Sequence, residues 1–380
     1  CKTNNKSTMK IGILTQPLET NYGGILQNYA LQKILCDMGH IVYTIDRHND
    51  AITIRQILSY IKRNLARILL RKTVSGKFRF EYNRREMLYV TANMQQFIQA
   101  NIKTTSYISS NKKLKKIKSY NFDCYVVGSD QIWIPFYTPE AFISFDKRPN
   151  VRRIAYAASF GVDYWNYDKQ TTRICKDLAK RFNAISVRED SSVQLCQQYL
   201  NIKPTVVLDP TLLLSATDYL KLILPNDISK DSNLLMSYIL DYTEDKYTVV
   251  ENVCKIRQLT KHEVYPLPNQ SMKTVIPSIS KWLAGFYTSK FVVTDSFHGL
   301  VFSLIFNKPF VVIGNESRGL ARFTSILKLI HMEDRLIMTH ADVDRVFAMD
   351  LSLDFSSINK ILYKEKVKSM SFIEDALNSK

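Results

Sequence analysis

A chain of 380 residues is longer than one ordinary hydrophobic core supports, so we expect two domains. Its 46% hydrophobic content and its low numbers of Gly and Pro, 11 each, exclude a collagen-like or low-complexity chain. The six cysteines are scattered with no CxxC pair, which excludes a zinc ribbon or a disulfide framework and favours a reducing, cytoplasmic setting. No run approaches the ~20 apolar residues that span a bilayer.

The net charge of +17 is concentrated in one segment. Between Arg55 and Lys118 there are 16 basic residues against two acidic ones, Glu81 and Glu86, so this segment carries +14. The rest of the chain is close to neutral, and few aromatic residues interleave with the basic ones. A nucleic-acid-binding protein is therefore only a distant alternative, and we expect no nucleic-acid partner.

The first half of the chain alternates apolar runs with helical patterns. Residues 10–14 predict a strand, a loop with two glycines follows, and residues 25–39 have helical periodicity that ends at a glycine. A strand at 41–46 completes a βαβ unit. After a basic stretch, 51–118, that predicts amphipathic helices, further strands are expected at 122–130, 152–160, 181–190 and 206–210.

The second half repeats this alternation. Strands are expected at 233–240, 262–268, 291–295 and 309–314, with helices after each and a last long helix over 356–379. Such a pattern predicts an α/β fold with two parallel, Rossmann-like sheets. The expected divisions are a first domain, 9–210, with a basic helical insertion at 51–118, a second domain, 211–355, and a terminal helix, 356–380, packing back on the first domain.

Ligands of open parallel sheets bind beyond the carboxyl ends of the strands. Two loops of the first half qualify, because each follows a predicted strand. One precedes a helix N-terminus, whose free N–H groups favour an anion, although its two glycines are also what a tight turn needs. In the other loop, a structural cap is the alternative to ligand binding. The residues concerned are Asn21, Tyr22, Gly23 and Gly24 in the first loop and Gly128, Ser129 and Asp130 in the second.

Arg188 also stands at the end of a predicted strand. Its guanidinium matches a carboxylate or a phosphate bidentately, which predicts an anion clamp. A local salt bridge to Glu189 or Asp190 is the open alternative.

His298 is the strongest candidate for a catalytic residue. The segment 294–300, TDSFHGL, follows a strand, Asp295 or Ser296 can cap the next helix, and His298 falls in its first turn. The positive end of the helix disfavours a charged imidazole and a bound anion favours it, so this histidine is a candidate proton donor. A hydrogen-bonded cap histidine is the alternative.

The loop after the next strand adds Asn315, Arg318 and Arg322, which would line the same edge with cations. No metal-ligand spacing is present, so we expect neither a metal nor another cofactor.

Taken in order, five segments resemble the polysaccharide pyruvyl transferase family, over nearly all of residues 10–335. They are KIGILTQPLETNYGGILQNYALQKILCDMGH, YNFDCYVVGSDQIW, RIAYAASFG, ISVRED and VVTDSFHGLVFSLIFNKPFVVIG. The resemblance implies a GT-B-like fold whose domains face a cleft. It implies phosphoenolpyruvate as the donor substrate, and a lipid-linked glycan or polysaccharide acceptor destined for the cell envelope.

The resemblance also implies residue roles. Arg188 and His298 match the family's donor-site residues, and Phe297 and Gly299 flank that histidine as substrate-binding positions. Many members carry an arginine two positions before the histidine, where this chain has Ser296. The missing cation would then come from Arg318, Arg322 or Lys308.

A sugar-nucleotide glycosyltransferase of the same architecture remains the nearest alternative. For the basic segment 51–118 two explanations stay open, a merely solvated surface or peripheral contact with anionic lipid at the inner face of the membrane.

Overall fold

The computed structural model describes residues 8–48, 84–266, 274–315, 319–338, 342–344 and 352–379. The first domain is built on a six-stranded sheet of order β2-β1-β3-β4-β5-β6, in which every neighbouring pair is parallel. Its strands are β1 (Lys10–Leu14), β2 (Ile41–Thr44), β3 (Cys124–Val127), β4 (Arg152–Ala158), β5 (Ala184–Val187) and β6 (Thr205–Val206).

The second domain contains a five-stranded parallel sheet of order β11-β10-β9-β7-β8. Its strands are β7 (Leu234–Tyr238), β8 (Thr260–Glu263), β9 (Phe291–Thr294), β10 (Phe310–Ile313) and β11 (Leu336–Ile337). Helices cover both faces of parallel sheets, so their strands are continuously apolar, as in CYVV of β3 and FVVI of β10, whose residues are all buried. The predicted two-domain α/β architecture is confirmed.

The helices that connect these strands are mostly those that the periodicity predicts. They are α1 (Tyr22–Asp37), α6 (Asp190–Leu195), α7 (Ala216–Leu220), α8 (Glu244–Arg257), α9 (Ile279–Thr288), α10 (Phe297–Ile305) and α11 (Ala321–Leu329). None of the described helices is both long and apolar enough to cross a bilayer.

Two elements differ from the expectation. Helix α5 (Lys169–Ala179) was not predicted. Only Cys175 and Ala179 of its eleven residues are buried, so its apolar stripe is short. Strand β8 occupies Thr260–Glu263 rather than 262–268, because it is a polar strand at the sheet edge with no fully buried residue.

The predicted basic insertion is only partly described. Its last part contains α3 (Arg84–Val90), α4 (Ala92–Asn101) and a ten-residue 3-10 helix, η2 (Asn111–Tyr120), whereas residues 49–83 lie outside the described ranges. Between α4 and η2 the chain is not helical. It runs beside the end of β2, with parallel bridges from Thr44 to Thr104 and from Arg47 to Ile108.

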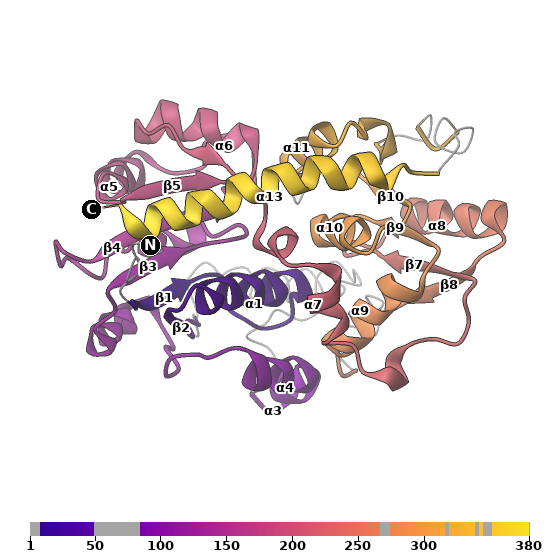
Figure 1. The fold of residues 1–380 in the computed structure, drawn as a ribbon, viewed down its shortest axis with the longest axis horizontal. Helices are drawn as coiled ribbons and strands as arrows, with labels where there is room; N and C mark the ends of the chain where they lie inside the picture. Colours follow the sequence, from indigo (N-terminus) through magenta and orange to yellow (C-terminus); the bar gives the residue numbers. More distant parts are fainter. Residues whose placement is uncertain are drawn as a thin grey trace, which may run out of the picture.

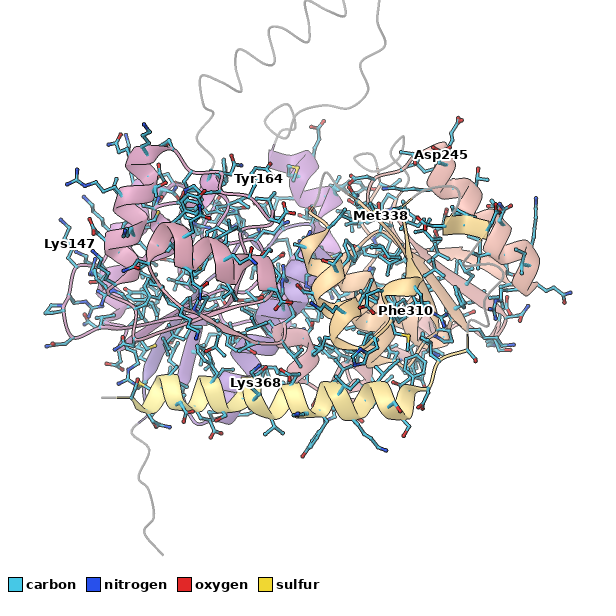
Figure 2. All side chains as sticks on the ribbon, turned by 90° about the horizontal axis from the view of Figure 1, so that it is seen from above. Lys147, Tyr164, Asp245, Phe310, Met338 and Lys368 are labelled. Atoms are coloured by element: carbon cyan, nitrogen blue, oxygen red, sulfur yellow. The ribbon has the colours of Figure 1, made fainter. Side chains whose placement is uncertain are left out.

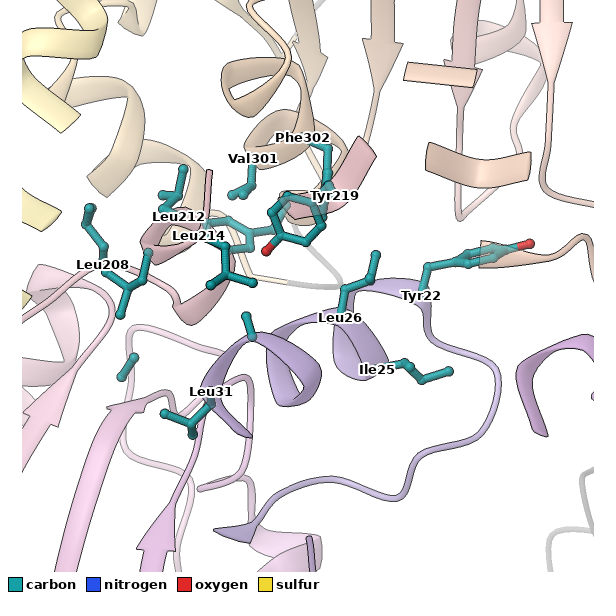
Figure 3. Close-up of a cluster of buried hydrophobic side chains, with 14 of the residues drawn as sticks. Tyr22, Ile25, Leu26, Leu31, Leu208, Leu212, Leu214, Tyr219, Val301 and Phe302 are labelled. Carbon is teal, nitrogen blue, oxygen red and sulfur yellow. The ribbon is translucent and has the colours of Figure 1, made fainter. Parts of the chain in front are cut away.

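One hydrophobic cluster joins the two domains (Figure 3). Leu26 and Leu31 of α1 face side chains from the chain segment that crosses between the sheets, among them Leu212 and Tyr219. The Tyr219 ring packs edge-on against Phe302 of α10, with ring centroids 4.9 Å apart. The domains therefore share a core.

The terminal helix α13 (Phe355–Asn378) runs along both domains (Figure 1). Near its start Asn359 donates to Asn307 of the second domain, at 3.2 Å. Farther along, the Ser369 hydroxyl accepts from the Leu208 N–H at 2.9 Å, and Arg152 of β4 donates to the Ala376 carbonyl at 3.2 Å. Figure 2 shows the same helix, with Lys368 labelled, along one side of the molecule.

The end of β2 is tied to the loop after β1 by a histidine. His48 Nδ1 lies 2.9 Å from Glu19 Oε1, and His48 Nε2 lies 2.7 Å from Asp46 Oδ1. Burial alone would lower the pKa of His48, but the hydrogen bonds to Asp46 and Glu19 raise it to about 9. The imidazole is therefore charged at neutral pH.

Because His48 is held in its charged form by Glu19 and Asp46, we expect the protein to lose stability in mild alkali. A histidine whose folded pKa is raised contributes its full stability below its ordinary pKa of about 6.5, and that contribution disappears as pH rises through about 9. The shift corresponds to about 3 kcal/mol. Melting temperatures of wild type and His48→Gln, measured from pH 6 to 10, should converge as pH rises. If the melting temperatures of the two proteins changed with pH in parallel, the charged contact of His48 with Glu19 and Asp46 would be contradicted.

Candidate active site

The candidate site lies where the two sheets reverse their strand order. In the first sheet, β1 lies between β2 and β3, and in the second, β7 lies between β8 and β9. At such switch points the loops diverge to opposite faces, which leaves room for a ligand at the carboxyl edge. The loops that follow β1, β3 and β9 carry most of the residues predicted from the sequence.

Arg188 is the centre of a buried ionic cluster. It follows β5, and only 2% of its side chain is exposed. Its Nη1 donates to Asp209 Oδ2 at 2.7 Å and its Nη2 to Asp130 Oδ1 at 3.1 Å. The guanidinium also lies over the ring of Phe297 from the second domain, 4.4 Å from its centroid.

The expected local salt bridge is therefore not the main pairing of Arg188. The nearest Glu189 oxygen is 3.9 Å from Arg188 Nε, whereas the two aspartates that accept its hydrogen bonds are 58 and 21 residues away. Because a buried guanidinium requires compensating charge, these two carboxylates fix its position.

The sequence did not identify Asp209 as a site residue, because it lies near the end of the strand predicted at 206–210. It is fully buried, and its Oδ1 accepts from both the N–H and the hydroxyl of Thr211, at 3.0 and 2.7 Å. Its Oδ2, which binds Arg188, lies 3.8 Å from Nε2 of His298. Burial would raise the pKa of Asp209, but His298 and Arg188 hold it well below its usual range.

His298 stands in the first turn of α10, as predicted, and is buried. Its ring lies against the first turn of α1 in the other domain. A Cβ atom placed on Gly23 would be only 1.9 Å from His298 Nδ1. Gly23 is thus required for the close approach of the imidazole, and the histidine lies between the α1 N-terminus and Asp209.

The other residues of the first loop have distinct positions. Asn21 precedes α1 and its amide donates to Asp130 at 3.5 Å, which links this loop to the one after β3. Tyr22 points away from the cluster, stacks on Trp282 at 5.2 Å and donates its hydroxyl to the Pro277 carbonyl at 2.6 Å. Both partners belong to the second domain, so we interpret Tyr22 as an interdomain contact, and its burial there raises its pKa.

In the loop after β3, Asp130 belongs to the cluster and its two neighbours support it. Ser129 donates to the Ala157 carbonyl at 2.9 Å and lies 3.3 Å from Asp209 Oδ2. A Cβ atom on Gly128, whose φ is +132°, would meet the Tyr156 carbonyl at 2.0 Å. The loop therefore depends on glycine at this position to approach β4.

The sequence that carries the two sheets and the candidate site identifies the protein family. A family model described as polysaccharide pyruvyl transferase matches residues 21–317. The chain belongs to this family. A comparison with curated proteins finds no match.

Solved structures agree on the fold of this pyruvyl transferase family member. A glycosyltransferase from Rickettsia africae has a TM-score of 0.53 at 10% identity, over 98% of this chain and 100% of that one. A UDP-GlcNAc 2-epimerase from Methanocaldococcus jannaschii has a TM-score of 0.52 at 10% identity, over 91% and 94%. The same epimerase from Neisseria meningitidis, bound to UDP-GlcNAc, gives 0.51 at 11%, over 98% and 100%. These matches support the GT-B-like architecture.

Ser296, which stands where many members of the pyruvyl transferase family have arginine, is the N-cap of α10. Its hydroxyl accepts from the Gly299 N–H at 3.4 Å, and a Cβ atom on Gly299 would meet Thr294 Oγ1 at 2.2 Å. A positively charged side chain from another helix nevertheless lies in this region. Arg322 of α11 is buried, with Nη1 3.7 Å from Asp130 Oδ1 and its guanidinium carbon 5.7 Å from the Phe297 centroid. Arg318 lies outside the described residues.

Asn315 belongs to a separate network after β7 and β10. Its amide donates to Asp241 at 2.6 Å and lies 3.3 Å from Asp295. Asp295 pairs with Lys246 at 2.8 Å and accepts from two backbone N–H groups, so it does not cap α10. Lys308 precedes β10, at the opposite end of that strand from Asn315, and its Nζ lies 5.8 Å from the ring centroid of Tyr287. No group of three or more described His, Cys, Asp or Glu residues is placed to hold a metal ion.

Neighbouring glycines of α1 give a matched test of the interdomain contact. Gly23→Ala should displace His298 and destabilise the protein by ~1–3 kcal/mol, the usual range for overpacking. Gly24→Ala should be tolerated, because its Cβ would meet only the flexible Asn21 amide, at 3.1 Å. Denaturant unfolding of both variants measures the difference. Equal effects would mean that His298 does not pack on Gly23.

Proposed function

We propose that the protein transfers pyruvate from phosphoenolpyruvate to two hydroxyls of a sugar, forming a cyclic ketal. The observation that carries this proposal is the position of His298. Its Nε2 side is directed to the buried carboxylate of Asp209, and its Nδ1 side to the first turn of α1. A residue able to carry a proton therefore lies between a buried carboxylate and a helix N-terminus, and such a terminus favours anions.

The electrostatics fit a donor with about three negative charges. Helix α1 has no acidic residue in its first turn, and Asn21 makes no side-chain cap bond to it, so its first N–H groups are available for phosphate or carboxylate. Arg188 and Arg322 add positive charge, part of which Asp130 and Asp209 already compensate. The N-terminus of α1 is therefore the main proposed anion site, and Arg188 and Arg322 lie beside it.

In the proposed reaction, His298 donates a proton to the methylene carbon of phosphoenolpyruvate, which becomes the methyl group. The adjacent carbon becomes oxocarbenium-like, and one sugar hydroxyl adds to it. Phosphate then leaves as the C–O bond to it breaks, and the second hydroxyl closes the ketal. Of the two hydroxyl protons, one restores His298 and the other leaves with phosphate. Asp209 keeps the imidazole oriented.

A glycosyltransferase that uses a sugar nucleotide is the second candidate. It is favoured by the fold, which the R. africae glycosyltransferase shares at a TM-score of 0.53. The two reactions differ in the product that is released, inorganic phosphate in one and a nucleotide in the other, so one product assay separates them.

The proposed chemistry predicts a large effect at His298. His298→Ala should lower phosphate release from phosphoenolpyruvate by ~10²–10⁴-fold, the usual range for loss of a general acid. Arg188→Lys should mainly raise KM for the donor. The assay follows phosphate with carrier-linked glycans as acceptors. Wild-type turnover in the His298 variant, or UDP release in place of phosphate, would overturn the proposal.

A peripheral contact with anionic membrane is part of the same proposal. The segment η2, NKKLKKIKSY, has five exposed lysines and no acidic residue, while Leu114 and Ile117 anchor it to the core. The lysines therefore face solvent together. Basic residues near an anionic bilayer contribute ~1 kcal/mol each, which would hold the protein reversibly beside a lipid-linked acceptor.

Liposome sedimentation tests this contact. Replacing the five η2 lysines by glutamine should weaken binding to anionic vesicles at least about tenfold at low salt, and high salt should have the same effect on wild type. The matched control replaces exposed lysines of α13, Lys360, Lys364 and Lys368. If both variants lost vesicle binding equally, or if wild type bound neutral and anionic vesicles equally, the proposed membrane contact would be wrong.

A further inference from the structure

Arg47 is a buried cation that the proposed reaction does not use. It follows β2, and only 2% of its surface is exposed. Within the described residues its guanidinium makes one hydrogen bond, from Nη2 to the Thr15 carbonyl at 3.2 Å, and its Nη1 is buried without a hydrogen-bond partner. A buried donor that has no acceptor costs free energy. Such a group in a folded protein therefore needs an explanation.

The charge of Arg47 also lacks the compensation that other buried arginines have. Arg188 is paired with two aspartates. Arg153, equally buried, donates to three backbone carbonyls, those of Asp146, Arg148 and Val151. Burial lowers the pKa of Arg47 to about 10, and the electrostatic effects of Tyr137 and Glu140 offset this only in part. Arg47 is thus charged at neutral pH, and no carboxylate of the described residues forms an ion pair with it.

Hydrogen bonds connect Arg47 to the candidate active site. The Thr15 carbonyl accepts from Arg47, and the Thr15 hydroxyl accepts from the amide of Gln27 on α1 at 2.8 Å. Gln27 in turn accepts from the Ser129 N–H at 2.9 Å, in the loop that contributes Asp130. Because β1 lies between β2 and β3, Arg47 is on the opposite side of the β1–α1 loop from Asp130. Two strand spacings, about 10 Å, separate the ends of β2 and β3.

We propose that Nη1 of Arg47 binds an oxyanion of the acceptor. A guanidinium matches the two oxygens of a phosphate or a carboxylate with parallel N–H groups. This inference rests on the proposed function, in which the donor occupies the α1 N-terminus beside His298. Arg47, on the β2 side of the same loop, is then left for a second anionic group. The acceptor supplies it as the phosphate of its lipid carrier or as the carboxylate of an acidic sugar.

The chain segment that covers Arg47 belongs to the surface. The ring centroid of Tyr137 lies 4.5 Å from the guanidinium carbon. Tyr137 ends a short 3-10 helix, η3 (Pro135–Tyr137), which has no buried residue, and Phe136 beside it is 51% exposed. Segments with few buried contacts open at a low cost in free energy. An oxyanion therefore reaches Nη1 when η3 moves, without a change in the hydrophobic core.

Isothermal titration calorimetry on the full chain tests this site without any reaction. The probes are inorganic pyrophosphate, for a carrier phosphate, and methyl glucuronide, for an acidic sugar, at constant ionic strength. Wild type should bind at least one of them, and Arg47→Met should weaken that binding at least about tenfold, as for loss of a charge-assisted hydrogen bond. Arg47→Lys keeps the charge but not the fork and should lose less. The matched control is Arg173→Met, at an exposed arginine of α5.

Unfolding by denaturant separates this role from a structural one. Replacement of a buried charge by an apolar side chain of similar size is often neutral or stabilising. Without ligand, Arg47→Met should therefore unfold at the same denaturant concentration as wild type or at a higher one. A lower midpoint, or a variant that does not fold, would show that Arg47 is structural and would overturn the proposal.

The binding data can also contradict the proposal directly. It is wrong if wild type binds neither probe, or if Arg47→Met binds them as wild type does. If binding of phosphoenolpyruvate fell tenfold in the same variant, the oxyanion would belong to the donor, and the assignment to the acceptor would be overturned. Probe binding that depends on Arg47, without phosphate release from phosphoenolpyruvate, would refute the proposed function and leave the anion site standing.

Discussion

The buried guanidinium of Arg188 is the constraint on which the rest of the site depends. A charge that is almost removed from solvent must be compensated nearby, and Asp130 and Asp209 supply this compensation from two other strand ends. The shared carboxylate of Asp209 then approaches His298 of the second domain. One buried cation thereby sets the positions of groups from three loops and both domains.

The interdomain contacts explain how such a cluster keeps its geometry. The domains share a hydrophobic core through Tyr219 and Phe302, and α13 binds to both of them. Contacts of this kind restrict relative motion of the domains more than the small polar interfaces usual between domains. The close packing of His298 on Gly23 requires that restriction, because a shift of one domain would separate them.

The sequence alone determined the architecture and several of the loops that meet between the two domains. Apolar strands alternating with helices predict parallel sheets, and ligand sites follow strand ends, so Gly23, Asp130, Arg188 and His298 were identified from their positions along the chain. These predictions use local periodicity and a general property of the fold. Helix α5 was missed in this way, because its buried stripe consists only of Cys175 and Ala179.

Only the tertiary structure decided which of these residues meet and which do not. Asp209 looked like the end of a strand, Tyr22 like a loop residue near a ligand, and Arg188 like a partner of its neighbour Glu189. In the folded chain Asp209 joins Arg188 to His298, and Tyr22 turns to Trp282. The physical reason is that charge compensation and ring packing act through space. The partners lie far apart along the chain, as Tyr22 and Trp282 do, and leave no periodic trace in the sequence.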